Sequence, residues 1–265
     1  MGESNQKQNE EKYVYKFFRW DSLQPLLKNK KLRLERTETW ENVDSDGDVY
    51  ENCVFNSLYN NNLPLEKSNI YGQSWSFNRS SDAMWRIYSQ KPLKGQHIND
   101  LQKTAVKVKT TIPKLKKVLL NPISPIDYDK YSYMGKVKYM GPKKYKEWLN
   151  NSEKNKIIKS LFIKRWAYVH EREYRIIVYV DSEKSPENIE FNIDTNYLFD
   201  RFFLDPRLDD TQRKEFENCL VESYGISKEK IDKSSLYTFN DTLTKGVLLD
   251  WQQPNKAITA IYWDY

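Results

Sequence analysis

One stretch late in the chain constrains the fold more than any other. Residues 176–180 read Ile-Ile-Val-Tyr-Val, a β-branched and aromatic run that predicts a buried β-strand. If the strand begins upstream at Tyr168, then Glu171, Glu173 and Arg175 alternate along it and share one face. Two carboxylates and a guanidinium at the mouth of a buried strand can hold a polar ligand. They can also simply pair with one another or with a neighbouring strand.

The composition is that of a folded chain with few cysteine and histidine side chains to bind a metal ion. The 265 residues suffice for one large domain or two small ones, and 14% aromatic residues predict an aromatic-rich core beneath a polar surface. The two cysteines, Cys53 and Cys219, lie far apart and form neither a disulfide framework nor a zinc pattern. With only His97 and His170 present, a histidine-based metal cluster is excluded, so we expect no metal site.

Residues 44–48 carry three aspartates that resemble the start of a calcium loop. The pattern fails because Gly47 is not at the sixth position and Phe55 stands where a glutamate is needed. Residues 1–12 are polar and lack the apolar core of a signal peptide, and no apolar run approaches the length of a membrane span. These features predict a soluble, cytoplasmic protein in a reducing compartment.

The pattern of elements predicts one mixed α+β domain of mostly antiparallel strands with scattered helices. We expect a disordered lead-in over residues 1–12, a single domain over 13–240, and a C-terminal extension over 241–265 that packs on it. Asp21 or Ser22 would cap a first helix, Ser80 or Ser81 a second, and Asp209 would form a capping box with Gln212. A basic helix is predicted over about residues 143–167, broken near 150–152. Strands are predicted over residues 13–20, 31–34, 70–77, 104–113, 136–139, 168–180, 188–193 and 257–263.

Three polar motifs fall near the ends of predicted strands in a fixed order: Arg19, then Ser74-Trp75-Ser76, then Glu171-Arg172-Glu173. This order resembles the arginine, serine, glutamate pattern of ADP-ribosyltransferases. The resemblance implies a split-sheet core and NAD as substrate. It implies that Arg19 contacts the NAD phosphate, that Ser74 orders the nicotinamide pocket, and that Glu173 polarises the ribose. Ser76 is a further candidate for cofactor binding. Glu171 would orient the acceptor.

The implied chemistry is physically coherent. Cleavage of the nicotinamide–ribose bond builds positive charge on the sugar, which a nearby carboxylate stabilises. The planar fork of a guanidinium matches phosphate oxygens, so Arg175 is a second candidate phosphate contact beside Arg19. The aromatic side chains of Tyr71, Trp75 and Tyr88 could stack on nicotinamide.

Each of these residues also has a structural interpretation. Serines at a strand end are often edge or capping groups, and Arg19 can be a surface charge at the end of its strand. Glu171 and Glu173 can form a ladder of ion pairs with Arg172, Arg175 or a neighbouring strand. Tyr88 lies on one helical face with Met84, which favours a place in the core.

A second resemblance covers about residues 13–240. The start Tyr15-Lys16-Phe17, the helix Met84-Trp85-Arg86-Ile87-Tyr88 followed by Gly95, and Trp166 upstream of Glu171-Arg172-Glu173-Tyr174-Arg175 resemble an uncharacterised bacterial family. The chain departs from this family at Trp40-Glu41-Asn42-Val43, where its members tend to carry an N-D-P-x-E turn. This kind of bacterial protein implies a role as a toxin or in phage defence.

Charge is distributed unevenly along the chain. Residues 103–165 hold 17 Lys and Arg against 4 Asp and Glu, whereas the whole chain is net +6. Such a basic segment attracts polyanions, although it can also be no more than a solvated lysine surface. Aromatic residues interleave with these lysines and could stack on bases: they are Tyr128, Tyr131, Tyr133, Tyr139, Tyr145 and Trp148.

Three functions follow from these patterns. The first is an NAD-dependent ADP-ribosyltransferase that modifies a macromolecular acceptor, either nucleic acid (RNA or DNA) or protein. The second is a non-catalytic nucleic-acid-binding module that uses residues 103–165. The third is a nucleotide hydrolase or binder on the same scaffold, with water as the acceptor.

Overall fold

The computed structural model describes residues 13–37, 69–119, 131–152, 156–180, 186–234 and 236. The predicted lead-in over residues 1–12, the aspartate-rich loop, Cys53, the extension over 241–265 and the strand over 257–263 lie outside these described residues.

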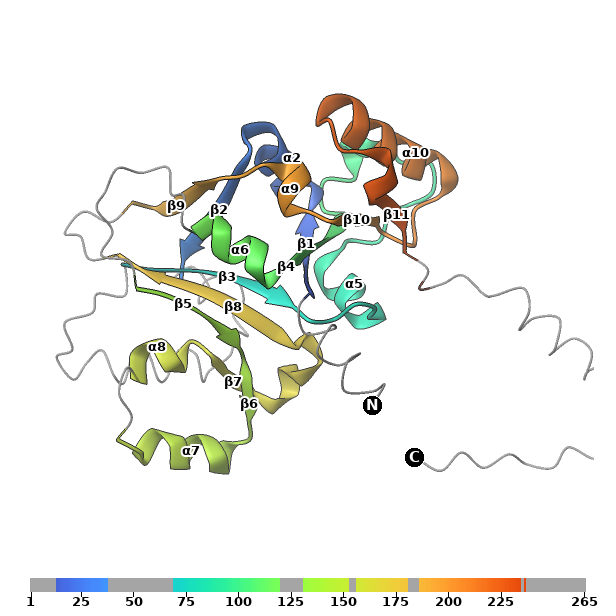
Figure 1. Ribbon diagram of the computed structural model, residues 1–265. Coiled ribbons are helices and arrows are strands. Elements are labelled where there is room, and N and C mark those ends of the chain that lie inside the picture. Colours follow the sequence, from blue (N-terminus) through green and yellow to red (C-terminus); the bar gives the residue numbers. More distant parts are fainter. Residues whose placement is uncertain are drawn as a thin grey trace, which may run out of the picture.

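Strands dominate the described chain, and short helices connect them (Figure 1). The strands are β1 Tyr13–Arg19, β2 Lys31–Arg36, β3 Ile70–Ser76, β4 Ala105–Thr111, β5 Tyr131–Lys136, β6 Lys138–Met140, β7 Ile163–Arg165, β8 Glu173–Tyr179, β9 Asn188–Asn192, β10 Arg201–Leu204 and β11 Ile231–Lys233. The α-helices are α2 Trp20–Asn29, α5 Asp82–Tyr88, α6 Ile112–Leu119, α7 Pro142–Asn150, α8 Lys156–Ser160, α9 Thr195–Leu198 and α10 Asp210–Asn218. The 3₁₀ helices are η2 Ile98–Asp100, η3 Trp166–Glu171 and η5 Lys228–Lys230, and a π-helical turn, η4, covers Cys219–Ser223.

Nine of the described strands form one sheet, in the order β11-β10-β4-β1-β3-β2-β9, with β8 paired to β3 and β5 paired to β8. Every pair in this sheet is antiparallel except β10 with β11. Strands β6 and β7 form a separate parallel pair. The predicted α+β class with mostly antiparallel strands is therefore confirmed.

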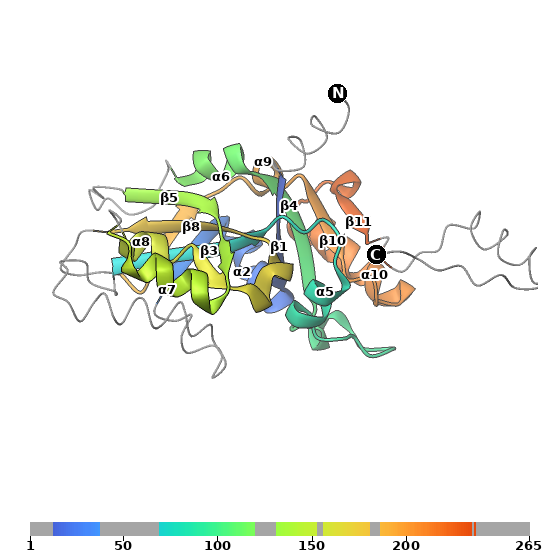
Figure 2. The same ribbon diagram turned by 90° about the horizontal axis from the view of Figure 1, so that it is seen from below.

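The sheet divides its residues between two faces because side chains alternate along each strand. One face packs against α2, α6 and α10 and holds the main hydrophobic core, which includes Trp20, Trp75 and Phe216. The opposite face packs against α8 in a smaller core that includes Ile70, Ile158 and Ile177. Figure 1 shows α6 above β3 and β8 and α8 below them, and Figure 2 shows the same layers from below.

Local signals in the sequence account for several element boundaries. Ser81 begins α5 by accepting a hydrogen bond from the Met84 amide, as predicted. Asp209 and Gln212 form the predicted capping box at the start of α10. By contrast, Arg19 is the N-cap residue of α2 and contributes no side-chain cap, so the predicted Asp21 or Ser22 cap is wrong.

The predicted basic helix over residues 143–167 is only half correct. Helices α7 and α8 exist, with a break at Asn151 as expected, but Ile163–Arg165 is strand β7 and pairs with β6. The lysine-rich pattern concealed this strand, because a three-residue strand shows too little alternation to be distinguished from a helix.

The sheet splits between β1 and β3. The two strands pair at a single position, Tyr15 with Ser76, whereas β1 pairs with β4 along its whole length. Further back along the same edge, Tyr71 and Gly72 of β3 pair with β2 instead. The edge of β3 between these two contacts therefore opens into a gap in the sheet.

Among the described residues, no helix is long and apolar enough to cross a lipid bilayer. The same part of the chain contains no group of three or more His, Cys, Asp or Glu side chains arranged to hold a metal ion.

Candidate functional site

Four charged side chains meet beside the split in the sheet. Lys164 Nζ lies 2.6 Å from Glu171 Oε2 and 2.8 Å from Glu173 Oε1, so one ammonium bridges both carboxylates. On the other side of Glu173, Arg175 Nε donates to Oε2 at 2.6 Å, and Arg175 also donates to the Leu161 carbonyl at 2.7 Å. Glu173 is 6% exposed. The ion-pair interpretation of Glu173 and Arg175 is thus confirmed.

The backbone around Glu171 differs from the predicted continuous strand. Strand β8 begins at Glu173, and Glu171 is the last residue of η3. Arg172 between them is left-handed, with φ of 46°, a conformation that turns the chain sharply. The prediction that Glu171 and Glu173 share a strand face is therefore wrong, although both carboxylates still reach Lys164 because the turn folds η3 back over the strand end.

The two carboxyl groups differ in protonation. Burial raises the pKa of Glu171 to about 8, and a hydrogen bond with Glu173 adds to this effect. Burial also disfavours the charge of Glu173, but the Arg175 guanidinium and the Lys164 ammonium outweigh it and hold the pKa of that carboxyl well below its usual range. Near neutral pH the site therefore contains one carboxylate and one carboxylic acid, a pattern that separates acid–base roles in enzymes.

Two tyrosines border the carboxylates. The Tyr139 hydroxyl accepts a hydrogen bond from the Glu173 amide at 2.8 Å. Tyr88 projects from α5, and its ring stacks on Phe17 at a centroid distance of 6.0 Å. Burial and the charges of Glu171 and Glu173 raise the pKa of both phenols. Both therefore remain neutral hydroxyls that can donate hydrogen bonds in this part of the site.

Lys16 occupies the gap in the sheet. Its ammonium donates to the Ser74 carbonyl at 2.8 Å, an oxygen on the stretch of β3 edge between its contacts with β1 and β2. Burial lowers the pKa of Lys16 to about 8, while Glu35 and Glu173 act in the opposite direction. An ammonium has three N–H donors, and Ser74 takes one of them. The split in the sheet therefore brings a cation into the electrostatic range of Glu173.

The two serines of the S-x-S motif have different surroundings. Ser74 is half-buried and lies opposite Arg175 in the β3–β8 register, on the same face as Glu173. Ser76 is buried, donates to the Glu171 carbonyl at 2.6 Å and accepts from the Asn78 amide at 3.0 Å. Ser76 thus fixes the end of η3 over β3, and Ser74, two positions earlier, lies on the same face of the strand.

Three residues assigned to the site by the sequence lie elsewhere. Trp75 and Tyr71 alternate with Ser74 on β3, so they point to the opposite face and are buried in the main core. The Trp75 indole donates to Gln73, and the Tyr71 hydroxyl donates to the Pro186 carbonyl. We therefore remove both from the site. Arg19 is half-exposed and pairs with Asp21, at the far end of β1 from the Tyr15–Ser76 contact.

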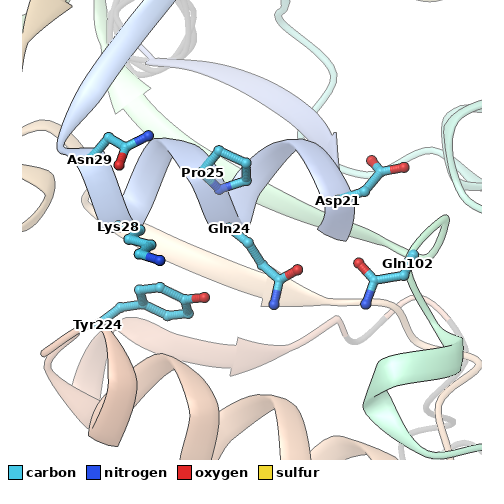
Figure 3. Close-up of a pocket in the computed structure, with 7 residues that line it drawn as sticks. All are labelled: Asp21, Gln24, Pro25, Lys28, Asn29, Gln102 and Tyr224. Atoms are coloured by element: carbon cyan, nitrogen blue, oxygen red, sulfur yellow. The ribbon is translucent and has the colours of Figure 1, made fainter.

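Two cavities of the described structure lie away from the carboxylates. The larger, of 510 Å³, lies between α2 and the π-helical turn (Figure 3). In that view Gln24 and Gln102 face each other, and Lys28 lies beside the Tyr224 ring. The smaller, of 360 Å³, lies at the start of α10 and is lined by Gly95, His97 and Asp209 among others.

Sequence reasoning missed Lys16, Tyr139 and Lys164. Lys164 was counted within a basic helix, and Lys16 alternates with apolar residues on a predicted strand, where a lysine normally marks a solvent-facing position. One signal in the sequence could have identified Lys16. It shares a strand face with Val14 and Phe18, which lie two positions away on either side and are both buried, and a lysine on a buried face is unusual.

The raised pKa of Glu171 gives a pH-dependent stability. Because the pKa of this group is raised above its ordinary value of 4.5, its contribution to stability is complete below about pH 4.5 and is lost as the pH rises toward about 8. We expect the unfolding temperature of the native protein to fall relative to that of Glu171→Gln over this window, and the difference to level off above it. Thermal unfolding of both proteins from about pH 5 to about pH 9 measures this. Parallel curves would show that Glu171 has an ordinary pKa.

No model of a known protein family matches the chain, and no curated protein matches it. The chain is similar to the solved structure of Thermus sp. 2.9 DarT in complex with NAD+, with a TM-score of 0.39 and 11% identity over 87% of this chain and 98% of that one. It is also similar to Thermus sp. 2.9 DarT in complex with ADP-ribosylated ssDNA, with a TM-score of 0.39 and 10% identity over 87% of this chain and 97% of that one.

Proposed function

We propose that the protein cleaves the nicotinamide–ribose bond of NAD and transfers the ADP-ribosyl group to a macromolecular acceptor. One observation carries the proposal: a carboxylate, Glu173, and a carboxylic acid, Glu171, lie side by side next to a split in the sheet that also holds a cation, Lys16. Anion, acid–base group and phosphate-binding cation are the three groups that this reaction needs.

Glu173 stabilises the positive charge that develops on the ribose. Its two oxygens each accept one hydrogen bond from a cation, and a carboxylate offers about four acceptor positions in all. It can therefore also accept from a ribose hydroxyl. The bond from C1′ to the pyridine nitrogen breaks, and its electron pair leaves with neutral nicotinamide.

Glu171 handles the proton of the acceptor. A pKa of about 8 leaves a fraction of this group ionised near neutral pH, and that fraction takes the proton as the acceptor's nucleophile bonds to C1′. Because Glu173 is almost fully buried, the ribose reaches it only when a neighbouring side chain gives way. Lys164, which comes from the small sheet and bridges both carboxylates, is the side chain we assign to that movement.

Lys16, rather than Arg19, contacts the NAD phosphate in this proposal. The Lys16 ammonium lies in the split within electrostatic range of Glu173, whereas the Arg19 guanidinium is half-exposed and paired with Asp21. A charge-assisted hydrogen bond from an ammonium to a phosphate is strong. We expect Lys16→Met to raise the KM for NAD about tenfold with a smaller effect on kcat, measured by nicotinamide release. The control is Lys31→Met. It removes a lysine of β2 that pairs with Glu190 of β9, and it should leave the KM for NAD unchanged. Equal KM values for native protein and Lys16→Met would contradict the role.

The direct test uses the full chain and NAD labelled in the adenylate. Nicotinamide release together with label on a nucleic acid or protein of a cell lysate supports transfer, whereas free ADP-ribose alone supports hydrolysis. If neither appears with any fraction, the enzymatic proposal fails.

A second function is favoured by the basic surface. Between Lys136 and Arg172, the described residues include ten Lys and Arg against two Glu. A non-catalytic nucleic-acid-binding module predicts salt-dependent binding to single strands that replacement of Glu173 leaves intact. Binding without any nicotinamide release would favour this function.

A further inference from the structure

Helix η3 exposes two of its apolar side chains and buries its acidic one. Trp166 is 63% exposed and Val169 is 38% exposed, whereas Glu171 at the end of the same helix is 5% exposed. In a 3₁₀ helix the side chains at positions i and i+3 lie in line, so Trp166 and Val169 form one outward ridge. A helix that buries its acid and exposes its tryptophan is typical of a surface that contacts a partner.

The ridge is held rigidly at the edge of the candidate site. Ser76 binds the Glu171 carbonyl, the Phe77 amide donates to the Arg172 carbonyl at 2.9 Å, and Asn78 donates to the His170 carbonyl. Three successive residues, the last of β3 and the two that follow it, therefore clamp the last turn of η3. The exposure of Trp166 consequently belongs to a fixed surface rather than to a loose segment.

Exposed apolar groups also lie on helix α5. Ile87 and Tyr88 are among the few large hydrophobic side chains exposed in the described chain. The charges of Glu171 and Glu173 act on the Tyr88 phenol, which places α5 beside the same cluster. An exposed aromatic residue of α5, Tyr88, therefore also lies within electrostatic range of the buried carboxylates.

The surroundings of the ridge are basic. Arg172 is exposed at the end of η3, and Arg165 at its start lies over the Tyr168 ring at 5.3 Å. The segments that carry η3 hold the ten-to-two excess of cations described above. A protein-docking surface would be depleted of charge at its centre, whereas flat aromatic faces among cations fit a strand of unpaired bases and phosphates.

We propose that the Trp166–Val169 ridge is a base-stacking platform that positions a single-stranded nucleic acid as the acceptor of the reaction. The inference rests on the proposed function and specifies its substrate class. A base stacks on the Trp166 indole, the neighbouring phosphates lie along Arg165 and Arg172, and an adjacent nucleotide extends toward Glu171.

Binding of a fluorescent oligothymidylate of about 16 nucleotides to the full chain tests the platform. Trp166→Ala should weaken binding at least about fivefold, as expected for the loss of one stacked base. Tyr197→Ala is the matched control, because Tyr197 is also an exposed aromatic residue and has Lys114 and Lys117 over its ring at 5.2 and 4.9 Å. This control should bind like the native protein, and unfolding temperatures should be the same for all three.

The outcomes separate this inference from the proposed function. Nicotinamide release into water should be unchanged in Trp166→Ala, while labelling of the oligonucleotide falls. Native-like binding by Trp166→Ala, or equal weakening in Tyr197→Ala, overturns the platform without touching the NAD chemistry. Labelling of a protein that depends on Trp166, with no binding of the oligonucleotide, overturns the nucleic-acid assignment.

Discussion

Replacing Glu173 by glutamine should lower the rate of NAD cleavage by about 100-fold or more, with little change in KM. Glutamine keeps the size of the side chain but removes the negative charge that would face the ribose as its bond to nicotinamide breaks. The same change leaves the buried Arg175 guanidinium in place, so its positive charge would face the developing cation without a compensating carboxylate. Nicotinamide release under saturating NAD measures the effect.

Two further variants make this test decisive. Glu190→Gln on β9 removes a surface carboxylate paired with Lys31 and should retain native activity. If Glu173→Gln folds poorly because Arg175 is left buried beside a neutral group, Glu173→Asp keeps the charge and withdraws it by one methylene. We expect Glu173→Asp to be folded and still strongly impaired in kcat. Native rates in a folded Glu173→Gln protein would reduce the cluster to a structural ion pair.

The largest effect on stability is expected at Asp205. Its carboxylate is fully buried and accepts from Arg207 Nε at 2.9 Å and from Ser89 Oγ at 2.5 Å, while the Ser89 oxygen accepts from the Ala105 amide. Asp205→Ala would leave the Arg207 guanidinium, whose side chain is only 13% exposed, without its anion. The free energy of unfolding should fall by about 3–5 kcal/mol, measured by denaturant titration.

Asp210→Ala provides the comparison. Asp210 also pairs with an arginine, Arg213, but its side chain is 81% exposed, so its loss should cost less than about 1 kcal/mol. Equal effects of the two changes would mean that the Asp205 cluster is no more than a surface ion pair. The cluster ties the end of β10 to the last turn of α5 and the start of β4, so Asp205→Ala should also displace Tyr88 from its place beside the carboxylates.

Local pattern was sufficient for much of the fold. The alternation of Leu32 and Leu34 identified β2, the serine before Met84 identified the start of α5, and the spacing of Asp209 and Gln212 identified α10. In each case the signal and the structure lie within a few residues of each other. Helical spacing was only half right for the face shared by Met84 and Tyr88, because Met84 is buried in the core whereas Tyr88 is 38% exposed.

Pattern was insufficient where long-range contacts decide the outcome. Glu171 follows a run that looks extended, yet Ser76 and Asn78, about ninety residues earlier, hold it in a helix. Alternation along β3 places Trp75 and Tyr71 on the opposite face from Ser74. Which of the two faces packs into the main core depends on the helices that cover each face, and local pattern does not show this.

The sequence by itself determined the antiparallel α+β class, the residues of the E-x-E motif and the excess of cations in the central segment. Only the tertiary structure decided that Lys16 lies in the gap between β1 and β3 and that Lys164 bridges both carboxylates. The physical reason is that charge states and ion pairs depend on burial and on distances between strands remote in the chain, neither of which is encoded in local spacing.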